Sequence, residues 1–245
     1  MNASPSTRAA ARTALVQHDA DLWSAEHQLR WPAGLVPIPV RMTVLRLRDR
    51  QLILHSPIPI STELRQELES LGPVGFIVVP HAHGKFAAEA AQAFPSAQLI
   101  AAPAPPASAR SLPFRAALPD QTPAAWAGEV ESLLVRGFRL REVLLYQRSS
   151  RTLVITDLCF NVQRSSSSLA RAFFRLDGMW QRFAPSLIIR AVGISDRAGF
   201  RSSLEQVQRW DFERIIPGHG DVLEHGGPAA LRAAWLARDL SPPAL

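Results

Sequence analysis

The chain has 245 residues, of which 47% are hydrophobic, and it carries a formal net charge of +6 at pH 7. This length and composition are sufficient for a sizeable hydrophobic core in one domain. No apolar run reaches the roughly 18 residues that a membrane span needs, and the single cysteine, Cys159, excludes an internal disulfide. We therefore expect a soluble, cytoplasmic protein with no membrane span.

The positive charge is typical of proteins that bind nucleic acid, but its distribution argues against that partner. Lys85 is the only lysine among 27 Lys and Arg residues, and the arginines are scattered along the chain instead of forming runs. A GC-rich genome produces such a skew without selection for polyanion binding. We expect a small-molecule substrate or ligand, and the sequence leaves the oligomeric state open.

The first half of the chain predicts alternating strands and helices. Residues 1–20 contain no acid before Asp19 and lack the apolar centre of a secretory signal, so they predict a mobile N-terminal arm before one domain over 21–245. Residues 42–47 and 51–55 predict a hairpin. A helix capped by Ser61 or Thr62 and ended by Gly72 follows, then a buried strand at 74–80, an Ala-rich helix to about 94 and a strand at 98–101. This alternation favours an α/β layered architecture with ligands at the carboxyl ends of the strands.

The second half begins with residues 103–123, whose six prolines predict a surface excursion. A second hairpin is predicted over 142–147 and 152–155, then a helical insert capped within the Ser165–Ser168 run, a helix around Phe200, a strand at 215–216 and a terminal helix from Pro228. The aromatic residues of the insert either wall a substrate cleft or pack in the core, and core packing is the commoner role for such residues.

Polar side chains follow three of the predicted strands. His81 and His83 come directly after the strand at 74–80, and Asp157 follows the second hairpin. His219 lies in the turn Pro217-Gly218-His219-Gly220 after an apolar strand. Histidine and carboxylate side chains are ligands for zinc and for ferrous iron, so the pattern indicates a metal site.

At these residues the chain resembles the metallo-β-lactamase superfamily, whose signature runs HxHxDH, a lone His, an Asp after a strand and a final His often written PGHG. His81, His83, Asp157 and His219 match that signature in register, whereas Lys85, Phe86 and Phe138 stand where it has Asp, His and His. The segments LHSP (54–57), TDLCFN (156–161) and PGHGD (217–221) resemble an uncharacterised branch of that superfamily, a domain of unknown function. The resemblance implies an αββα sandwich in a single domain.

The resemblance also implies metal-dependent hydrolysis, and the replaced residues limit the number of metal ions that the site can hold. The retained set, His81, His83, Asp157 and His219, is that of a site for one zinc or iron ion at most, or for none. With a metal, the chain is expected to be a hydrolase in which Asp157 is catalytic and orients a metal-bound water. The alternative is a non-catalytic member of the fold that binds a small molecule or a protein in a metal-free cleft.

Two further residues leave alternatives open. The Lys85 ammonium either compensates Asp157 in place of a metal or opens the following helix and faces solvent. His55 ends the strand before the LHSP turn, where it is either a substitute ligand or proton carrier, or a half-buried histidine bonded to backbone. Asp157 has a structural alternative of its own, as a carboxylate that caps the turn after its strand.

Overall fold

The computed structural model describes residues 14–31, 34–80, 83–103, 105, 107–119 and 122–235. The strands are β1 (Val16–Asp19), β2 (Leu22–Arg30), β3 (Pro37–Arg46), β4 (Leu52–His55), β5 (Val74–Val79), β6 (Gln98–Ala101), β7 (Ala116–Ala117), β8 (Val130–Leu134), β9 (Val143–Gln147), β10 (Thr152–Val154) and β11 (Arg214–Ile216). The helices are α1 (Thr62–Leu71), α2 (Ala87–Ala93), α3 (Ser168–Leu176), α4 (Leu187–Val192), α5 (Arg197–Val207) and α6 (Gly227–Trp235). Among these residues no helix is both long and apolar enough to cross a bilayer.

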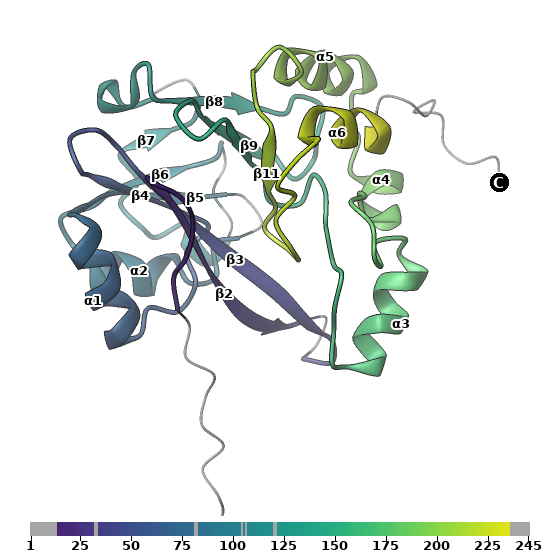
Figure 1. The fold of residues 1–245 in the computed structure, drawn as a ribbon, viewed down its shortest axis with the longest axis horizontal. Helices are drawn as coiled ribbons and strands as arrows, with labels where there is room; N and C mark the ends of the chain where they lie inside the picture. Colours follow the sequence, from purple (N-terminus) through teal and green to yellow (C-terminus); the bar gives the residue numbers. More distant parts are fainter. Residues whose placement is uncertain are drawn as a thin grey trace, which may run out of the picture.

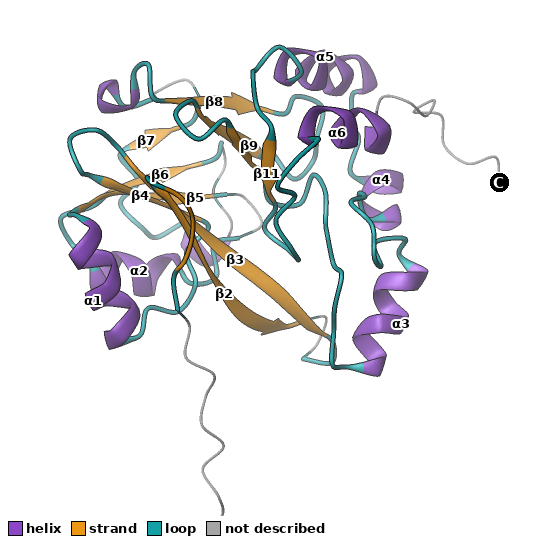
Figure 2. Ribbon diagram, viewed as in Figure 1, coloured by secondary structure: helices purple, strands orange, loops and turns teal. Residues whose placement is uncertain are grey.

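The strands form two sheets (Figures 1 and 2). The larger sheet has the order β1-β2-β3-β4-β5-β6-β7, antiparallel from β1 to β4 and parallel from β4 to β7. The smaller sheet has the order β11-β10-β9-β8, in which only β10 and β11 are parallel. The parallel pairs β4–β5 and β10–β11 matter for function, because the carboxyl ends of parallel neighbours lie at the same sheet edge.

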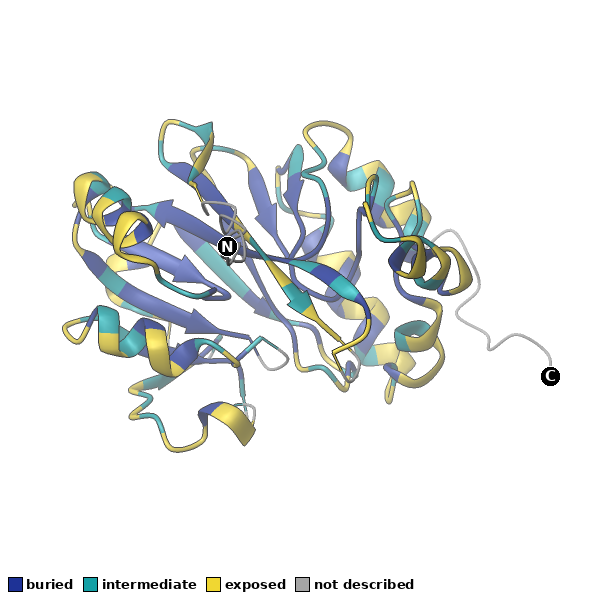
Figure 3. Ribbon diagram, turned by 90° about the horizontal axis from the view of Figure 1, so that it is seen from below, coloured by how far each residue is buried: buried dark blue, intermediate teal, exposed yellow. Residues whose placement is uncertain are grey.

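The two sheets pack face to face between helices, which confirms the predicted α/β sandwich. Alternation along β3 shows how: Val44 points toward α1 and α2, whereas its neighbour Leu45 points toward the second sheet. Residues of both sheets, among them Ile53 and Val154, form the middle layer of the core. A third cluster joins the smaller sheet to α5 and α6. Figure 3 shows the result, with buried strands inside and exposed helix faces outside.

Most elements with a strong local pattern lie where the sequence predicts them. The side chain of Ser61 caps α1 by accepting from the backbone N–H of Leu64, and Gly72 ends that helix. Ser167, within the predicted capping run, does the same for α3. The predicted hairpins are β3–β4 and β9–β10, and the predicted strands at 74–80 and 98–101 are β5 and β6.

Three segments differ from expectation. The predicted arm over 1–20 overlaps β1, which pairs with β2, so ordered structure begins before residue 20; residues 1–13 lie outside those described. The predicted surface excursion contains β7, which adds to the edge of the larger sheet because its backbone bonds to β6, and Leu118 beyond it is buried. The long strand β2 is unexpected, since its second half is largely exposed and carries no apolar run.

Candidate functional site

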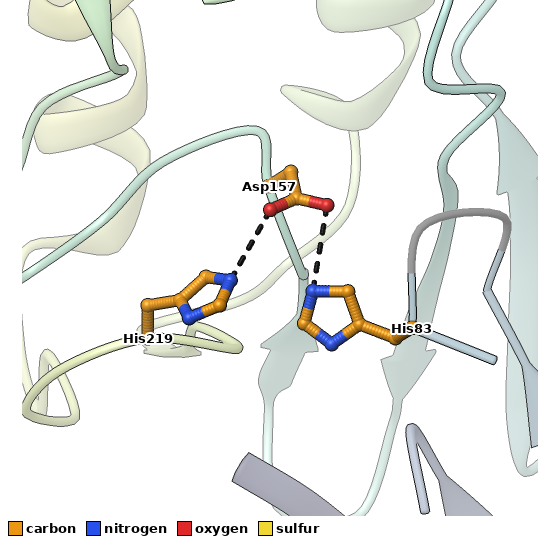
Figure 4. Close-up of side chains that lie close together, drawn as sticks. All are labelled: His83, Asp157 and His219. Carbon is orange, nitrogen blue, oxygen red and sulfur yellow. Dashed lines mark hydrogen bonds and ion pairs between the residues drawn. The ribbon is translucent and has the colours of Figure 1, made fainter. Parts of the chain in front are cut away.

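Three strand ends bring His83, Asp157 and His219 together (Figure 4). His83 follows β5, Asp157 follows β10 and His219 follows β11. The Nε2 atom of His83 lies 3.4 Å from Asp157 Oδ2, and that of His219 lies 3.2 Å from Asp157 Oδ1. One ligand atom from each residue lies within 4.8 Å of the other two, and this is the one such group of three or more among the described residues.

The turn that carries His219 is held by backbone contacts. The Nδ1–H of His219 donates to the Pro39 carbonyl of β3 at 2.7 Å, and the ring stacks on Phe160 with centroids 4.8 Å apart. Gly220 has φ of +86°, a conformation that favours glycine, and a Cβ there would meet the Asn161 carbonyl. A Cβ on Gly218 would lie 3.1 Å from His83 Cε1, so glycine lets the two histidine loops approach closely.

His83 is oriented from the neighbouring strand. Its Nδ1 lies 2.7 Å from the hydroxyl of Ser56, which directly follows β4. Ser56 has φ of +60° and donates its backbone N–H to Val78 of β5, so the chain turns sharply there and presents the hydroxyl to the ring. Ser56 belongs to the LHSP segment, but the hydrogen bond joins residues 27 positions apart and has no local sequence signal.

Glu142 is a buried site residue that the sequence patterns do not reveal. It lies directly before β9, and its side chain accepts from the backbone N–H of Thr156 at 2.6 Å and of Asp157 at 3.0 Å. Only 1% of Glu142 is exposed. Both carboxylate oxygens therefore hold the turn that presents Asp157. The signal available in the sequence is a single acid at the start of an otherwise apolar strand.

The buried charges at this site shift one another's pKa values. Burial would raise the pKa of Asp157, but the charge of His83 and the close approach of both histidine rings outweigh it and lower that pKa well below its ordinary range. Burial opposes protonation of His83, yet the Asp157 carboxylate, with a smaller contribution from Glu142, raises its pKa. Burial, followed by the charge of Asp157, raises the pKa of Glu142 to about 8.

Of the two other histidines in the predicted set, His55 is described and does not join this group. His81 lies outside the described residues. His55 is 1% exposed at the end of β4, and its Nε2 has no hydrogen-bond partner among the described atoms. Burial, together with the charge of His83, lowers the pKa of His55 to about 3, so it is neutral at physiological pH. His55 is thus fully buried, in contrast to the half-buried histidine that was one alternative.

The three replaced signature positions have different surroundings. The Lys85 side chain is exposed, and its ammonium lies 5.4 Å from the centroid of the Phe86 ring, with no carboxylate at ion-pair distance among the described residues. This placement favours the solvent-facing alternative over compensation of Asp157. Phe86 itself lines the cavity beside the site. Phe138 is 3% exposed and packs against Phe200 in the core.

A cavity of about 340 Å³ opens from the His83, Asp157 and His219 group. It runs between the far end of the β2–β3 hairpin and the helices α3 and α4, and most of its lining is apolar. Phe173, Phe174 and Met179 of the helical insert contribute to its wall. Phe174 is also fully buried. The aromatic residues of the insert therefore have both of the roles that the sequence offered as alternatives, lining the cleft and packing in the core.

Comparisons with known proteins agree with this architecture. The family described as Domain of unknown function (DUF4336) matches residues 19–177. A metallo-β-lactamase from Pontibacter korlensis shares 14% identity at a TM-score of 0.59, over 90% of this chain and 95% of its own. A metallo-β-lactamase from Hirschia baltica shares 12% identity at 0.60, over 93% and 98%. The metal-soaked Flv1 flavodiiron core from Synechocystis sp. PCC6803 shares 11% identity at 0.62, over 91% and 60%. No curated protein matches the chain.

Proposed function

This chain belongs to the family described as Domain of unknown function (DUF4336) and has a metallo-β-lactamase fold, and from that premise we propose that it is a hydrolase that uses one metal ion. His83, Asp157 and His219 would hold the ion, with His81 as a further predicted ligand. Two histidines and a carboxylate suit zinc or ferrous iron.

One observation at His219 carries this proposal. Because the Pro39 carbonyl can only accept, Nδ1 of His219 is the protonated nitrogen, and the neutral ring then has a lone pair on Nε2. That lone pair faces Asp157 Oδ1, another acceptor, at 3.2 Å. Two acceptors in contact require a proton or a cation between them. A bound cation would satisfy both.

The separation of the donor atoms also fits a metal. Ligand atoms bound tetrahedrally to zinc at about 2.0–2.1 Å are about 3.3 Å apart. The two contacts of Asp157 with the histidine Nε2 atoms are 3.2 and 3.4 Å. Both rings are further oriented through Nδ1, by Ser56 and by the Pro39 carbonyl, as is usual for metal-bound histidines.

The roles of the protein groups follow from their positions. A bound metal ion supplies Lewis acidity and lowers the pKa of a coordinated water toward neutrality. Asp157 remains anionic because its pKa is lowered, so its carboxylate can orient a water molecule at the head of the cavity. Glu142 fixes the Thr156–Asp157 backbone and thereby the direction of that carboxylate. The apolar lining of the cavity lowers the dielectric beside the site, which strengthens these electrostatic interactions.

The replaced positions support one ion per chain. A second ion needs its own set of donors, and Phe138 and Phe86 offer none, while Lys85 adds a positive charge on this side of the cavity. Within the described part of the chain, no second group of metal-binding side chains lies near the first.

Hydrolysis is tested with metal-loaded protein and small panels of esters, thioesters and phosphodiesters. We expect turnover with one equivalent of zinc or iron, loss of turnover after chelation, and loss in His219→Ala. The matched control is His225→Ala, because His225 is exposed and outside the site. Metal binding without turnover of any panel would contradict the proposed activity.

The alternative, a metal-free binding cleft, also has an observation in its favour. Protonated His83 would balance the Asp157 charge directly, since its pKa is raised by that carboxylate. With a second proton between His219 Nε2 and Asp157 Oδ1, the group would be complete without a metal. Protein purified without chelator distinguishes the two, because the hydrolase proposal requires about one equivalent of metal and the alternative requires none.

A further inference from the structure

The cavity beside the site has walls suited to hydrocarbon. Val40 and Ile38 of β3 form one side, and Phe174, Met179 and Ile189 of the helical insert form the other. Its volume of about 340 Å³ is in the range of small-molecule sites, which typically begin near 300 Å³. The catalytic group proposed above lies at one end of this apolar space, so a bound chain would place one end at His83, Asp157 and His219.

The polar side chains in the walls are already engaged. Ser186 donates to Asp177 Oδ2 at 2.6 Å, and the backbone N–H of Ile188 donates to Asp177 Oδ1 at 2.9 Å. Ser56 is in contact with His83. These groups therefore leave few hydrogen bonds for a sugar or a nucleobase inside the cavity. A ligand that fills it must be largely apolar there, since unpaired buried polar groups are costly.

The mouth of the cavity adds a charge preference. Lys85 lines it, is exposed and has no carboxylate at ion-pair distance among the residues that the structure describes. The apolar side chains of Trp31 and Ile188 also line the cavity, and they are 53% and 56% exposed. A flexible cation above an apolar surface suits an amphiphile with an anionic group.

We propose that the site takes an amphiphile with a hydrocarbon tail, which fills the cavity beside His83, Asp157 and His219, and an anionic group, which lies at Lys85. This inference names the substrate class of the hydrolase proposed above and rests on that function only for the chemical step. The binding itself requires only the apolar walls and the cation at the mouth.

The test is calorimetric titration of the full chain, both metal-free and with one equivalent of zinc, with straight-chain carboxylates from butanoate to decanoate below their micelle concentrations. We expect the Kd to fall about fourfold for each added methylene until the cavity is full. Alkyltrimethylammonium ions of the same lengths should bind more weakly, and Lys85→Glu should reverse that order. A Kd that is independent of chain length would overturn the proposal.

Matched variants on α4 separate the cavity from the general surface. Ile188→Glu places a charge in the cavity lining and should abolish the dependence on chain length. Val192→Glu makes the same change at a residue of the same helix that is 63% exposed and does not line the cavity, so it should bind like wild type. Equal losses in both variants would show surface adsorption and refute the site.

A second substitution at Ile188 keeps the test valid if Ile188→Glu does not fold. Ile188→Trp narrows the cavity without adding charge and should shorten the longest tail accepted; no change in that limit would contradict the proposed position of the tail. The metal-free titration separates this proposal from the hydrolase proposal. If only the hydrolase proposal is wrong, the Kd of the carboxylates still falls with chain length. If the amphiphile proposal is wrong, the Kd does not depend on chain length, even if zinc still binds.

Discussion

The cavity has a polar end and an apolar end, and the two are held in place differently. At the polar end, His83 and His219 are each fixed through Nδ1, and Asp157 is fixed through the backbone contacts of Glu142. At the apolar end, one wall includes α4, none of whose residues is buried. Contacts from β3 and from residues next to β4 and β9 thus hold the polar group in place, while a helix without buried residues borders the apolar space.

This difference has a consequence for mutation. A change at the polar end removes a partner from a buried group and leaves another group unsatisfied, which is costly. A change on the exposed face of α4 removes little buried surface and is inexpensive for the fold. The polar end should therefore control stability and metal affinity, and the apolar end should control which ligand binds.

The largest expected effect is that of Glu142→Ala. The substitution leaves the backbone N–H groups of Thr156 and Asp157 without acceptors in a buried turn, so we expect a loss of about 3 kcal/mol in the free energy of unfolding. Urea denaturation measures it. Glu205→Gln, on the exposed face of α5, is the control and should change stability by less than about 0.5 kcal/mol. A similar small change for Glu142→Ala would show that the turn does not need its acceptor.

The metal-free protein should also lose stability as the pH rises from 6.5 toward 8. The folded-state pKa values of Glu142, about 8, and of His83 are raised, so the folded state holds protons that the unfolded state has released, and this stabilisation is lost as pH rises through those values. His55, lowered to about 3, has the opposite effect, which is confined to pH below 6.5. Between about pH 4.5 and 6.5 the Glu142 and His55 effects oppose each other, so we expect stability to change little there and then to fall by on the order of 2 kcal/mol between pH 6.5 and 8.

Thermal melts across this pH range measure that loss. One equivalent of zinc should reduce it, because the ion binds the deprotonated imidazoles and replaces the missing positive charge. Stability that rises steadily from pH 6.5 to 8 in the metal-free protein would contradict the assigned pKa shifts.

Ser56→Ala tests the orientation of His83 without removing a proposed ligand. The variant loses the contact to Nδ1, and the loss of such an outer partner typically lowers metal affinity about 10–100-fold. Competition titration with a chromogenic chelator measures the zinc Kd. Ser70→Ala is the control, because it removes an exposed hydroxyl on α1, and it should leave the zinc Kd unchanged. Equal affinities of Ser56→Ala and wild type would mean that Ser56 does not position the ring.

The smallest effect on stability is expected at exposed apolar residues of α3 and α4. Leu176→Ser, at a residue that is 83% exposed, should change the free energy of unfolding by less than about 0.5 kcal/mol. The same limit applies to Ile188→Ser, although that residue lines the cavity. Urea denaturation of both variants is the measurement. A loss of several kcal/mol in either variant would show that the substituted side chain itself contributes to the core packing.

Local patterns predict the elements that depend on short stretches of sequence. The α1 helix has its cap, its apolar face and its terminating glycine within 12 residues, from Ser61 to Gly72, and it forms as predicted. Strand β5 is a continuous apolar run and also forms as predicted. Strand β2 depends on its register with β3, for example Glu26 opposite Arg41, and that pairing has no signal within residues 22–30 themselves.

The site divides in the same way. His83, Asp157 and His219 follow strands, so their convergence can be predicted from the ends of those strands. The roles of Glu142 and of the Pro39 carbonyl cannot, because one joins residues 15 positions apart and the other joins residues 180 positions apart. The sequence also cannot decide between the two alternatives for Lys85, because only its exposed position beside Phe86 in the folded chain distinguishes them.

Calorimetric titration of metal-free protein with zinc shows whether His83, Asp157 and His219 bind one metal ion. We expect one equivalent in wild type and no saturable binding in Asp157→Asn, which keeps the shape of the side chain but removes its charge. Two equivalents in wild type, no binding in wild type, or unchanged binding in Asp157→Asn would contradict the proposed metal site.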